Sequence, residues 1–398
     1  MFDAAFLYGG QCLVCRRQVP LLARALQVCP VCLKRFPGEA WPYVAAAHRL
    51  AREGYGLPGE APRGTPGIRC TLCFHECLIP EGEQGYCGLR ENQGGKLVVH
   101  AGIPGRGLLQ WYFDPIPTNC VAGLVCPERN GSGRKNLAVF YGSCSFNCLF
   151  CQNWHYRKMK GQRSTTSAAE LARVADTETA CICFFGGDPS SQMPHALAAG
   201  RRLAAKGVRV CWETNGAMHP RLLEQAVRLS LASGGCVKFD LKAWDPYLHL
   251  ALTGVGNRRT LENFRLAASY FPERPEPPLL VASTLLVPGY VDADEVYRIA
   301  RFIAGCDPRI PYFLLGFAPQ FHLGDLPPTS ARHARQAGEA ARAAGLHRVY
   351  LGNEHLFSRP TEWFLAPVVA KTKMKRHRAP GGEGNFFKLQ GPMPFSFH

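Results

Sequence analysis

The alternation of apolar runs with helix-like stretches, from residue 136 onward, is the feature that most limits how this chain can fold. Six consecutive units of this kind predict a parallel sheet with helices outside it. About 215 residues are few for a closed eight-unit barrel. We therefore predict an α/β fold with a partial (β/α)6 TIM-type barrel, and an open doubly wound sheet is the alternative. The predicted strands are 137–142, 181–187, 208–215, 236–243, 279–287 and 312–319, and the predicted helices lie near 167–176, 194–206, 220–230, 258–270, 292–304 and 329–344.

Three cysteines follow the first of these strands, in the segment CSFNCLFC. Cys144, Cys148 and Cys151 have the spacing C-x3-C-x2-C, at the strand end where a barrel places its chemistry. Such a loop can curl around one cubane cluster, in which three thiolates ligate three of four irons. A structural metal site closes its coordination, whereas a reactive one keeps a position for substrate. The pattern favours a reactive cluster over a zinc knuckle that lacks one ligand or three core thiols.

The segment resembles the cluster loop of the radical S-adenosylmethionine (SAM) superfamily, with Phe150 as the aromatic residue that packs near adenine in that family. The resemblance implies a [4Fe–4S] cluster whose open iron is chelated by the amino and carboxylate groups of SAM. It also implies that an electron from the cluster cleaves SAM to methionine and a 5′-deoxyadenosyl radical, which abstracts hydrogen.

Three further motifs stand at successive strand ends, in the order that the superfamily shows. FFGGDP (184–189) resembles its GGE-type motif, and WETNG (212–216) and KFDLK (238–242) resemble the (D/E)TNG and D-x-K motifs of glycyl-radical-enzyme activases. Lys242 suits the SAM carboxylate, although Asp240 and Lys242 could also pair with each other. The resemblance implies that these residues surround SAM: Gly186, Gly187, Asp188, Glu213, Thr214, Asn215, Asp240 and Lys242.

Over residues 70–353 the chain is similar to activase-like radical proteins found with AmmeMemo partners and to relatives of the pyruvate formate-lyase activating enzyme. This similarity implies an oxidoreductase that activates a glycyl-radical-type protein and takes electrons from a donor such as flavodoxin or ferredoxin. His322 is a loose match to a cofactor-contacting histidine, and a surface imidazole is the alternative. Modification of RNA or a peptide is a second enzyme hypothesis, and a non-catalytic zinc-ribbon scaffold or nucleic-acid-binding protein is a third.

Eight cysteines before the barrel form two sets. Cys12, Cys15, Cys29 and Cys32 have the spacing C-x2-C-x13-C-x2-C, which favours a zinc ribbon over a rubredoxin-type redox centre. The second set has the spacing C-x2-C-x3-C-x9-C, which fits zinc or an auxiliary iron–sulfur cluster equally well. The members of the second set are Cys70, Cys73, Cys77 and Cys87.

The remaining cysteines have no ligand pattern of this kind. Cys120 and Cys126 would need a further ligand from elsewhere, so unpaired structural thiols are the safer interpretation. The other five lie in or next to apolar segments and are predicted core residues. These are Cys181, Cys183, Cys211, Cys236 and Cys306. His155 is predicted to shape the cluster loop.

The metal-type cysteine patterns and the lack of a long apolar run predict a cytoplasmic protein without a membrane span. The formal charge of +16 would attract an acidic partner without identifying it. We predict a zinc-ribbon-like module (1–52), a Gly/Pro linker (53–67), a second cysteine-rich module with a connector (68–135), the barrel (136–353) and a basic extension (354–398). The extension is either solvated, which charge runs usually are, or a docking strip.

Overall fold

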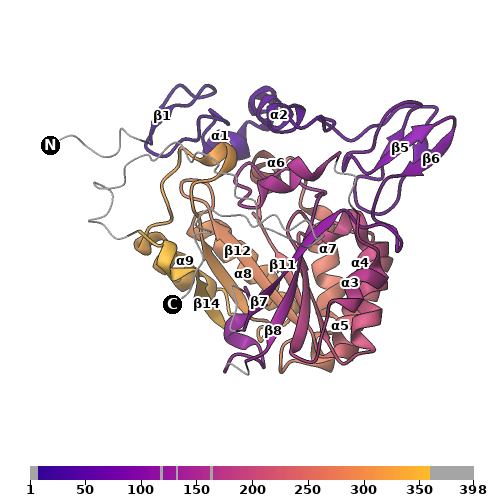
Figure 1. Ribbon diagram of the computed structural model, residues 1–398. Helices are drawn as coiled ribbons and strands as arrows, with labels where there is room; N and C mark the ends of the chain where they lie inside the picture. Colours follow the sequence, from indigo (N-terminus) through magenta and orange to yellow (C-terminus); the bar gives the residue numbers. More distant parts are fainter. Residues whose placement is uncertain (1–7, 117–119, 131–132, 162–164, 359–398) are drawn as a thin grey trace, which may run out of the picture. The chain divides into compact units, whose positions relative to one another are not determined.

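The centre of the structure is one sheet of eight strands (Figure 1). The computed structural model describes residues 8–116, 120–130, 133–161 and 165–358. The spatial order of the strands is β14-β13-β12-β11-β10-β9-β8-β7, the order of the sequence in reverse. A doubly wound sheet would change direction at a switch point, so the partial-barrel prediction is confirmed. The strands are β7 (Leu109–Pro115), β8 (Lys135–Tyr141), β9 (Thr179–Phe185), β10 (Arg209–Thr214), β11 (Val237–Asp240), β12 (Leu280–Leu286), β13 (Tyr312–Gly316) and β14 (Val349–Gly352).

Helices connect the parallel strands and cover the outer face of the sheet (Figure 1). All six predicted strands and all six predicted helices are present, and the short helix α6 was not predicted. Many begin at a residue suited to cap them: Asp245 at α6, Asp292 at α8 and Ser330 at α9 each accept a backbone N–H of the first turn. The helices are α3 (Ala168–Arg173), α4 (Met193–Ala204), α5 (Pro220–Ser233), α6 (Pro246–Thr253), α7 (Arg258–Ala268), α8 (Ala293–Cys306) and α9 (Ala331–Ala343).

The two edges of the sheet differ from the sequence analysis. No strand was predicted in the connector that precedes the barrel, yet it contains β7, which pairs antiparallel with β8 from Leu109 opposite Tyr141 to Pro115 opposite Lys135. At the other edge, β14 pairs in parallel with β13. Both strands extend the barrel wall beyond the six predicted units.

Side chains alternate between the two faces of the strands, as strand geometry requires. A Cβ added at Gly200 of α4 would meet Val210 and Phe184, so these residues face the helices. Their neighbours Cys183 and Cys211, directly opposite each other in β9 and β10, therefore face the inner, concave side of the sheet. The inner side carries the chemistry described below.

The N-terminal residues pack against loops at the carboxyl ends of the strands. The backbone N–H of Ala23 donates to the hydroxyl of the buried Tyr290 over 3.1 Å, and Lys34 pairs with Glu295 at 3.0 Å. Figure 1 shows α2 close to α6 along this edge. The elements of this part of the chain are β1 (Gly10–Gln11), β2 (Gln18–Val19), α1 (Pro30–Arg35), α2 (Pro37–Glu53), β3 (Ile68–Arg69), β4 (Leu78–Ile79), β5 (Arg90–Gln93) and β6 (Lys96–Val99).

Short 3-10 turns complete the structure: η2 (Gly123–Val125), η3 (Trp154–Met159), η4 (Pro189–Gln192), η5 (Phe271–Glu273), η6 (Phe321–Leu323) and η7 (Glu354–Leu356). None of the helices in the described part of the chain is both long and apolar enough to span a bilayer. The module boundaries given above stay predictions, and the basic extension lies outside the described residues from residue 359 onward.

Candidate active site

The three-cysteine loop begins at Cys144, three residues after the end of β8, and is held along its backbone by the end of α6. The N–H groups of Asn147 and Leu149 donate to the carbonyls of Thr253 and Leu252, over 2.8 and 3.0 Å. The carbonyl of Leu149 accepts in turn from the N–H of His322 over 2.9 Å. The loop is therefore fixed by two segments that follow it in the chain by about 100 and 170 residues. Backbone contacts to ordered segments of this kind favour a rigid position for the three ligands.

Two histidines from the N-terminal part of the chain also hold this loop. Nε2 of His75 lies 2.7 Å from the carbonyl oxygen of Ser145. Nε2 of His48 lies 3.0 Å from the carbonyl oxygen of Ala251, and its Nδ1 lies 3.0 Å from Nδ2 of Asn147. Because a carbonyl only accepts, His48 carries its proton on Nε2 and accepts at Nδ1 from the Asn147 amide. Sequence analysis missed both histidines.

Gly186 and Gly187 lie against the start of the loop, where no side chain fits. Both have positive φ, +59° and +51°. A Cβ at Gly187 would lie 2.3 Å from the carbonyl oxygen of Ser143 and 2.4 Å from that of Tyr141, and one at Gly186 would lie 2.1 Å from the Phe140 ring. Glycine lets the end of β9 cross the end of β8 at this distance. The Gly-Gly pair thus positions the backbone next to the cysteine loop.

Asp188 joins the ends of β9 and β10. It is 2% exposed, and its Oδ2 accepts from the N–H of Asn215 over 2.7 Å and from the hydroxyl of Thr214 over 2.9 Å. Its Oδ1 accepts from the N–H of Ser190 over 2.7 Å. Burial raises the pKa of Asp188 despite these hydrogen bonds. The carboxylate therefore has its acceptor positions occupied by the protein itself.

Asn215 reaches the first cysteine of the loop. Its Nδ2 donates to the hydroxyl of Ser145 over 3.1 Å and lies 3.7 Å from Sγ of Cys144. Its Oδ1 accepts from the N–H of Ala217 over 2.9 Å. The end of β10 is thereby placed beside Cys144, as expected if the motif of this strand and the cysteine loop serve one site.

Lys242 and Asp240 form an ion pair at the end of β11, with 2.6 Å between Nζ and Oδ2. This is the local pairing left open in the sequence analysis. Oδ1 of Asp240 also accepts from the Ser283 hydroxyl over 2.6 Å. Nζ of Lys242 lies 5.8 Å from the centre of the Phe150 ring. Burial works to lower the pKa of Lys242, but Asp240 and Cys148 outweigh it and raise that pKa.

Glu213 lies on the same strand as Thr214 but points to the inner side of the sheet. Its Oε1 pairs with Nζ of the buried Lys238 at 2.8 Å. Within the described residues, Glu213 makes no hydrogen bond or ion pair to the cysteine loop. A contact between Glu213 and SAM therefore stays a prediction.

The loop thiols lie in a buried setting with cations next to them. Burial raises the pKa of Cys148 to about 12, and Lys242 counteracts this rise. Arg157 is 2% exposed, and its Nη2 donates to Oδ1 of Asn147 over 2.9 Å. Its Nε and Nη1 have no hydrogen-bond partner within the residues that the structure describes. Buried N–H groups without a partner are costly, so an anionic group with acceptor atoms beside the thiols fits this environment.

The donor set also fits a [4Fe–4S] cluster. Three cysteines on one loop offer three thiolates, which leaves one iron of a cubane without a protein ligand from that loop. Lys242 and Arg157 complement the negative charge of a thiolate-bound cluster. Arg157, in the basic segment NWHYRKMK (153–160), was not predicted, and its charge alone would not have distinguished it from a surface residue.

The first four-cysteine set is preassembled. The sulfur atoms of Cys12, Cys15, Cys29 and Cys32 all lie within 4.8 Å of one another, and among the described residues this is the one such group of metal-ligand side chains. The N–H of Cys29 donates to Sγ of Cys12 over 3.3 Å. Cys29 precedes α1 and Cys32 lies within it. This set has the arrangement required to bind a metal ion.

The second set surrounds a small fold next to the cysteine loop. The N–H of Cys70 donates to the carbonyl of Cys77 over 2.8 Å, and Nη1 of Arg90 lies 3.6 Å from Sγ of Cys87. The backbone of Cys73 forms an isolated antiparallel β-bridge with that of Met218, three residues after Asn215. In the part of the chain that the structure describes, no three of these sulfur atoms form a group as tight as the first set.

His155 and His322 make no contact that assigns them a role in cofactor binding. The ring of His155 stacks on Trp154 at 3.8 Å between centroids, which agrees with the predicted shaping of the loop. The His322 ring lies against Phe321, with 4.2 Å between centroids. His322 is connected to the site by its backbone contact with Leu149 and by the nearby charge of Arg157, which helps burial to lower the pKa of His322.

The family model of the Radical SAM superfamily matches residues 138–303. Isethionate sulfite-lyase activating enzyme of Desulfovibrio desulfuricans is 35% identical over 267 residues, which cover 63% of this chain and 78% of that protein. Pyruvate formate-lyase 1-activating enzyme of Escherichia coli K12 is 25% identical over 184 residues, or 44% of this chain and 71% of that enzyme. A solved domain of pyruvate-formate lyase-activating enzyme from Bacteroides vulgatus aligns with a TM-score of 0.36 and 20% identity, over 44% of this chain and 99% of that domain.

Proposed function

This chain belongs to the radical SAM superfamily, and we propose that it is an activating enzyme that abstracts hydrogen from a glycyl-radical-type protein. The observation that carries this proposal is the cysteine loop itself. The loop lies at the end of a barrel strand. Contacts from α6 and from His48, His75 and His322 fix its position. Lys242 and Arg157 lie beside its thiols. The relatives that are named as activating enzymes favour a protein substrate.

In this proposal Cys144, Cys148 and Cys151 hold a [4Fe–4S] cluster, and the strand ends around them hold SAM. When bound, the cluster and SAM supply a reductive cleavage that yields the 5′-deoxyadenosyl radical. Asn215 orients Cys144, and the ring of Phe150 in the loop lies 5.8 Å from Nζ of Lys242. Lys242 would exchange part of its pairing with Asp240 for the carboxylate of SAM, which is a charge-assisted contact of the same kind.

Asp188 acts in this proposal as a positioning residue and not as a ligand of SAM. Its oxygens accept from Thr214, Asn215 and Ser190 and fix the strand-end backbone. The backbone at Gly186 and Gly187 then offers polar groups next to the loop. Because the space of a Cβ at either glycine is filled by Phe140, Tyr141 and Ser143, the missing side chains bring this backbone up to the start of the cysteine loop.

The test is anaerobic reconstitution followed by addition of dithionite and SAM. We expect 5′-deoxyadenosine to form, and we expect an added glycyl-radical protein to develop an oxygen-sensitive doublet in its electron paramagnetic resonance spectrum. Absence of 5′-deoxyadenosine from fully reconstituted protein would contradict enzyme activity of this kind. Formation of 5′-deoxyadenosine together with hydrogen abstraction from RNA or a peptide would instead assign a modifying enzyme.

For the first four-cysteine set we propose a structural zinc ion. Tetrahedral Zn–S bonds of about 2.3 Å place thiolates roughly 3.8 Å apart, which agrees with sulfur atoms that all lie within 4.8 Å. For the second set we propose an auxiliary iron–sulfur cluster, because its sulfur atoms do not form so tight a group and a cluster of several irons spaces its thiolates more widely. A cytoplasmic flavodoxin or ferredoxin would supply the electron.

A further inference from the structure

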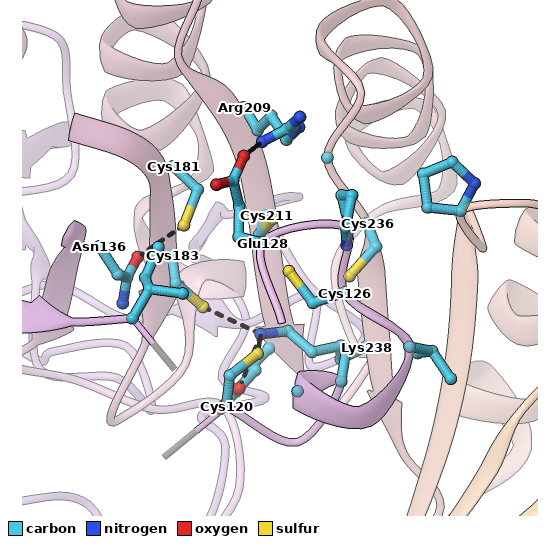
Figure 2. Close-up of a pocket in the computed structure, with 18 of the residues that line it drawn as sticks. Cys120, Cys126, Glu128, Asn136, Cys181, Cys183, Arg209, Cys211, Cys236 and Lys238 are labelled. Carbon is cyan, nitrogen blue, oxygen red and sulfur yellow. Dashed lines mark hydrogen bonds and ion pairs between the residues drawn. The ribbon is translucent and has the colours of Figure 1, made fainter. Parts of the chain in front are cut away.

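Six cysteines outside the sites described above line one cavity on the inner side of the barrel (Figure 2). The cavity has a volume of about 110 Å³. Six of its 25 lining residues are cysteine, against 18 of 398 in the whole chain. The six are Cys120, Cys126, Cys181, Cys183, Cys211 and Cys236.

Strand alternation brings these cysteines together. Ala138, Cys183 and Cys211 occupy one row across β8, β9 and β10, and Asn136, Cys181 and Arg209 occupy the next row. Cys236 directly precedes β11, and its carbonyl accepts from the N–H of Trp212 over 3.0 Å. All the side chains in these two rows face away from α4, so they meet inside the barrel.

The segment that contains Cys120 and Cys126 closes the cavity on the side opposite the strands. Figure 2 shows this segment, which includes η2, lying across the strand cysteines. Glu128 anchors it by ion pairs to Arg209 and to Arg134. Cys120 and Cys126 were interpreted as unpaired thiols and the strand cysteines as core residues. The structure instead places them around a common space.

A buried cation lies among the sulfur atoms. Lys238 has 2% of its side chain exposed, and its Nζ lies 3.2 Å from Sγ of Cys120, 3.2 Å from Sγ of Cys183 and 2.8 Å from Glu213. An ammonium group in such a place requires anionic neighbours, and Glu213 is one. A buried lysine is not expected in a purely apolar core. Its ammonium group would instead offset the charge of an anionic group held by these thiolates.

The sulfur spacing distinguishes between kinds of metal centre. Within the described residues, no three of these cysteines have sulfur atoms that all lie within 4.8 Å of one another. One zinc ion draws its thiolates closer than this, so the cavity is not preassembled for a single tetrahedral ion. We leave Cys181 out of the candidate ligands, because its thiol donates to Oδ1 of Asn136 over 3.3 Å. The remaining cysteines offer five sulfur ligands around the cavity, and a cluster with four thiolate ligands needs four of them.

We propose that this inner cavity binds an iron–sulfur cluster through cysteines of the set Cys120, Cys126, Cys183, Cys211 and Cys236, with Lys238 as its charge partner. Thiolate-bound clusters carry net negative charge, which the ammonium group offsets. Lys238 pairs with Glu213, two residues before Asn215 of the candidate active site, so β10 joins the two sites. The proposal goes beyond the proposed function, and either can fail without the other because its readout does not involve SAM cleavage.

The first test measures iron and acid-labile sulfide in anaerobically reconstituted full-length protein. The background is the variant Cys144→Ala/Cys148→Ala/Cys151→Ala, which lacks the loop thiols. Adding Cys183→Ser/Cys211→Ser is expected to lower iron by about two to four atoms per chain, the content of one cluster. The matched control is Cys306→Ser, since Cys306 ends α8 and does not line the cavity. Equal iron in the background with Cys183→Ser/Cys211→Ser and in the background with Cys306→Ser would overturn the proposal.

A second test uses the unaltered protein, so it does not depend on how the variants fold. Iodoacetamide labelling of reconstituted and of chelator-treated protein is compared by mass spectrometry. We expect four of the five cavity cysteines to be protected at least tenfold by iron and sulfide, with Cys306 labelled equally in both samples. Equal labelling of the cavity cysteines with and without iron, or protection by zinc alone, would contradict an iron–sulfur cluster at this place.

Discussion

At the scale of single residues, Gly187 is a position in the candidate site that has no room for a side chain. Its φ of +51° and the two carbonyl oxygens within 2.4 Å of an added Cβ exclude any side chain unless the backbone moves. Gly187→Ala is therefore expected to lower the free energy of unfolding by at least about 2 kcal/mol and to reduce iron in the loop site. The measurements are urea unfolding and iron content after reconstitution.

The control for that variant is Gly256→Ala, because a Cβ at Gly256 would meet nothing within 4 Å. We expect this variant to keep both its stability and its iron. If Gly187→Ala kept the same stability and iron content as Gly256→Ala, the result would contradict the close approach of the end of β9 to the cysteine loop.

Lys242 gives a prediction for SAM binding. Lys242→Met removes the ammonium group beside Asp240 and Cys148, and a charge-assisted contact contributes about 1.5–3 kcal/mol. The Kd for SAM is expected to rise roughly 10- to 100-fold, measured by equilibrium dialysis against the reconstituted protein. Lys206→Met serves as control, since Nζ of Lys206 donates to the carbonyl of Ala172 in α3. An unchanged Kd in Lys242→Met would remove Lys242 from the SAM site.

His48 makes the stability of the loop depend on pH. Burial lowers its pKa to about 4, against an ordinary value of 6.5. Below pH 6.5 the unfolded chain takes up a proton that the folded chain does not, so the free energy of unfolding falls as the pH is lowered from about 6.5 to 4. At about 1.4 kcal/mol per pKa unit the loss reaches up to about 3 kcal/mol. Protonation would also place an N–H at Nδ1 against the Asn147 amide.

The prediction is tested by urea unfolding at pH 7.5 and pH 5 in the wild type and in His48→Asn. Other groups, including metal-bound thiolates, titrate in both proteins and cancel in the difference. The wild type is expected to lose more stability on acidification than the variant does. Equal losses would show that His48 does not hold the loop in its neutral form.

At the scale of secondary-structure elements, α1 depends on the first cysteine set. Its six residues begin after Cys29 and contain Cys32, and helices this short are not stable by themselves. Cys32→Ser is expected to abolish zinc binding and to lower the thermal midpoint by several degrees, whereas Cys306→Ser leaves both unchanged. Zinc analysis and calorimetry measure the two effects. Full zinc occupancy in Cys32→Ser would contradict the four-thiolate site.

The elements that were predicted are those with a strong local pattern. Apolar runs such as 181–187 and 279–287 predicted β9 and β12 within two residues at each end. β7 was missed because its sequence, LQWYFDP, alternates only partly and follows a segment rich in glycine and proline. β14 was missed because four residues carry too weak a period to count. Both are stabilised by pairing with a neighbour strand that the sequence does not identify.

The candidate site shows the same division. Spacing identified Cys144, Cys148 and Cys151, because three ligands on one loop are local in sequence. The contacts of His48, His75 and Arg157 depend on how distant segments meet, so no pattern marked them. The strand cysteines were assigned to the core because alternation shows that residues share a face without showing that the face encloses a cavity.

At the scale of the whole described molecule, the two N-terminal cysteine sets and the barrel are joined by contacts at the cysteine loop. His48 from α2 and His75 from the second cysteine set both reach a loop that lies some 70 to 100 residues further along the chain. Loss of metal from either module is therefore expected to loosen the cysteine loop. Hydrogen exchange of the Asn147 and Leu149 amides, before and after chelation of zinc, would detect that loosening, and unchanged exchange would contradict the coupling.

The central claim is that Cys144, Cys148 and Cys151 hold a cluster with one iron available to SAM. The most direct measurement is the electron paramagnetic resonance spectrum of the reduced, anaerobically reconstituted protein, recorded with and without SAM. The account predicts a reduced-cluster signal that shifts on addition of SAM, and a loss of this SAM response in Cys144→Ala/Cys148→Ala/Cys151→Ala but not in Cys306→Ser. A spectrum that SAM leaves unchanged, or a SAM response that persists without the three loop thiols, would contradict it.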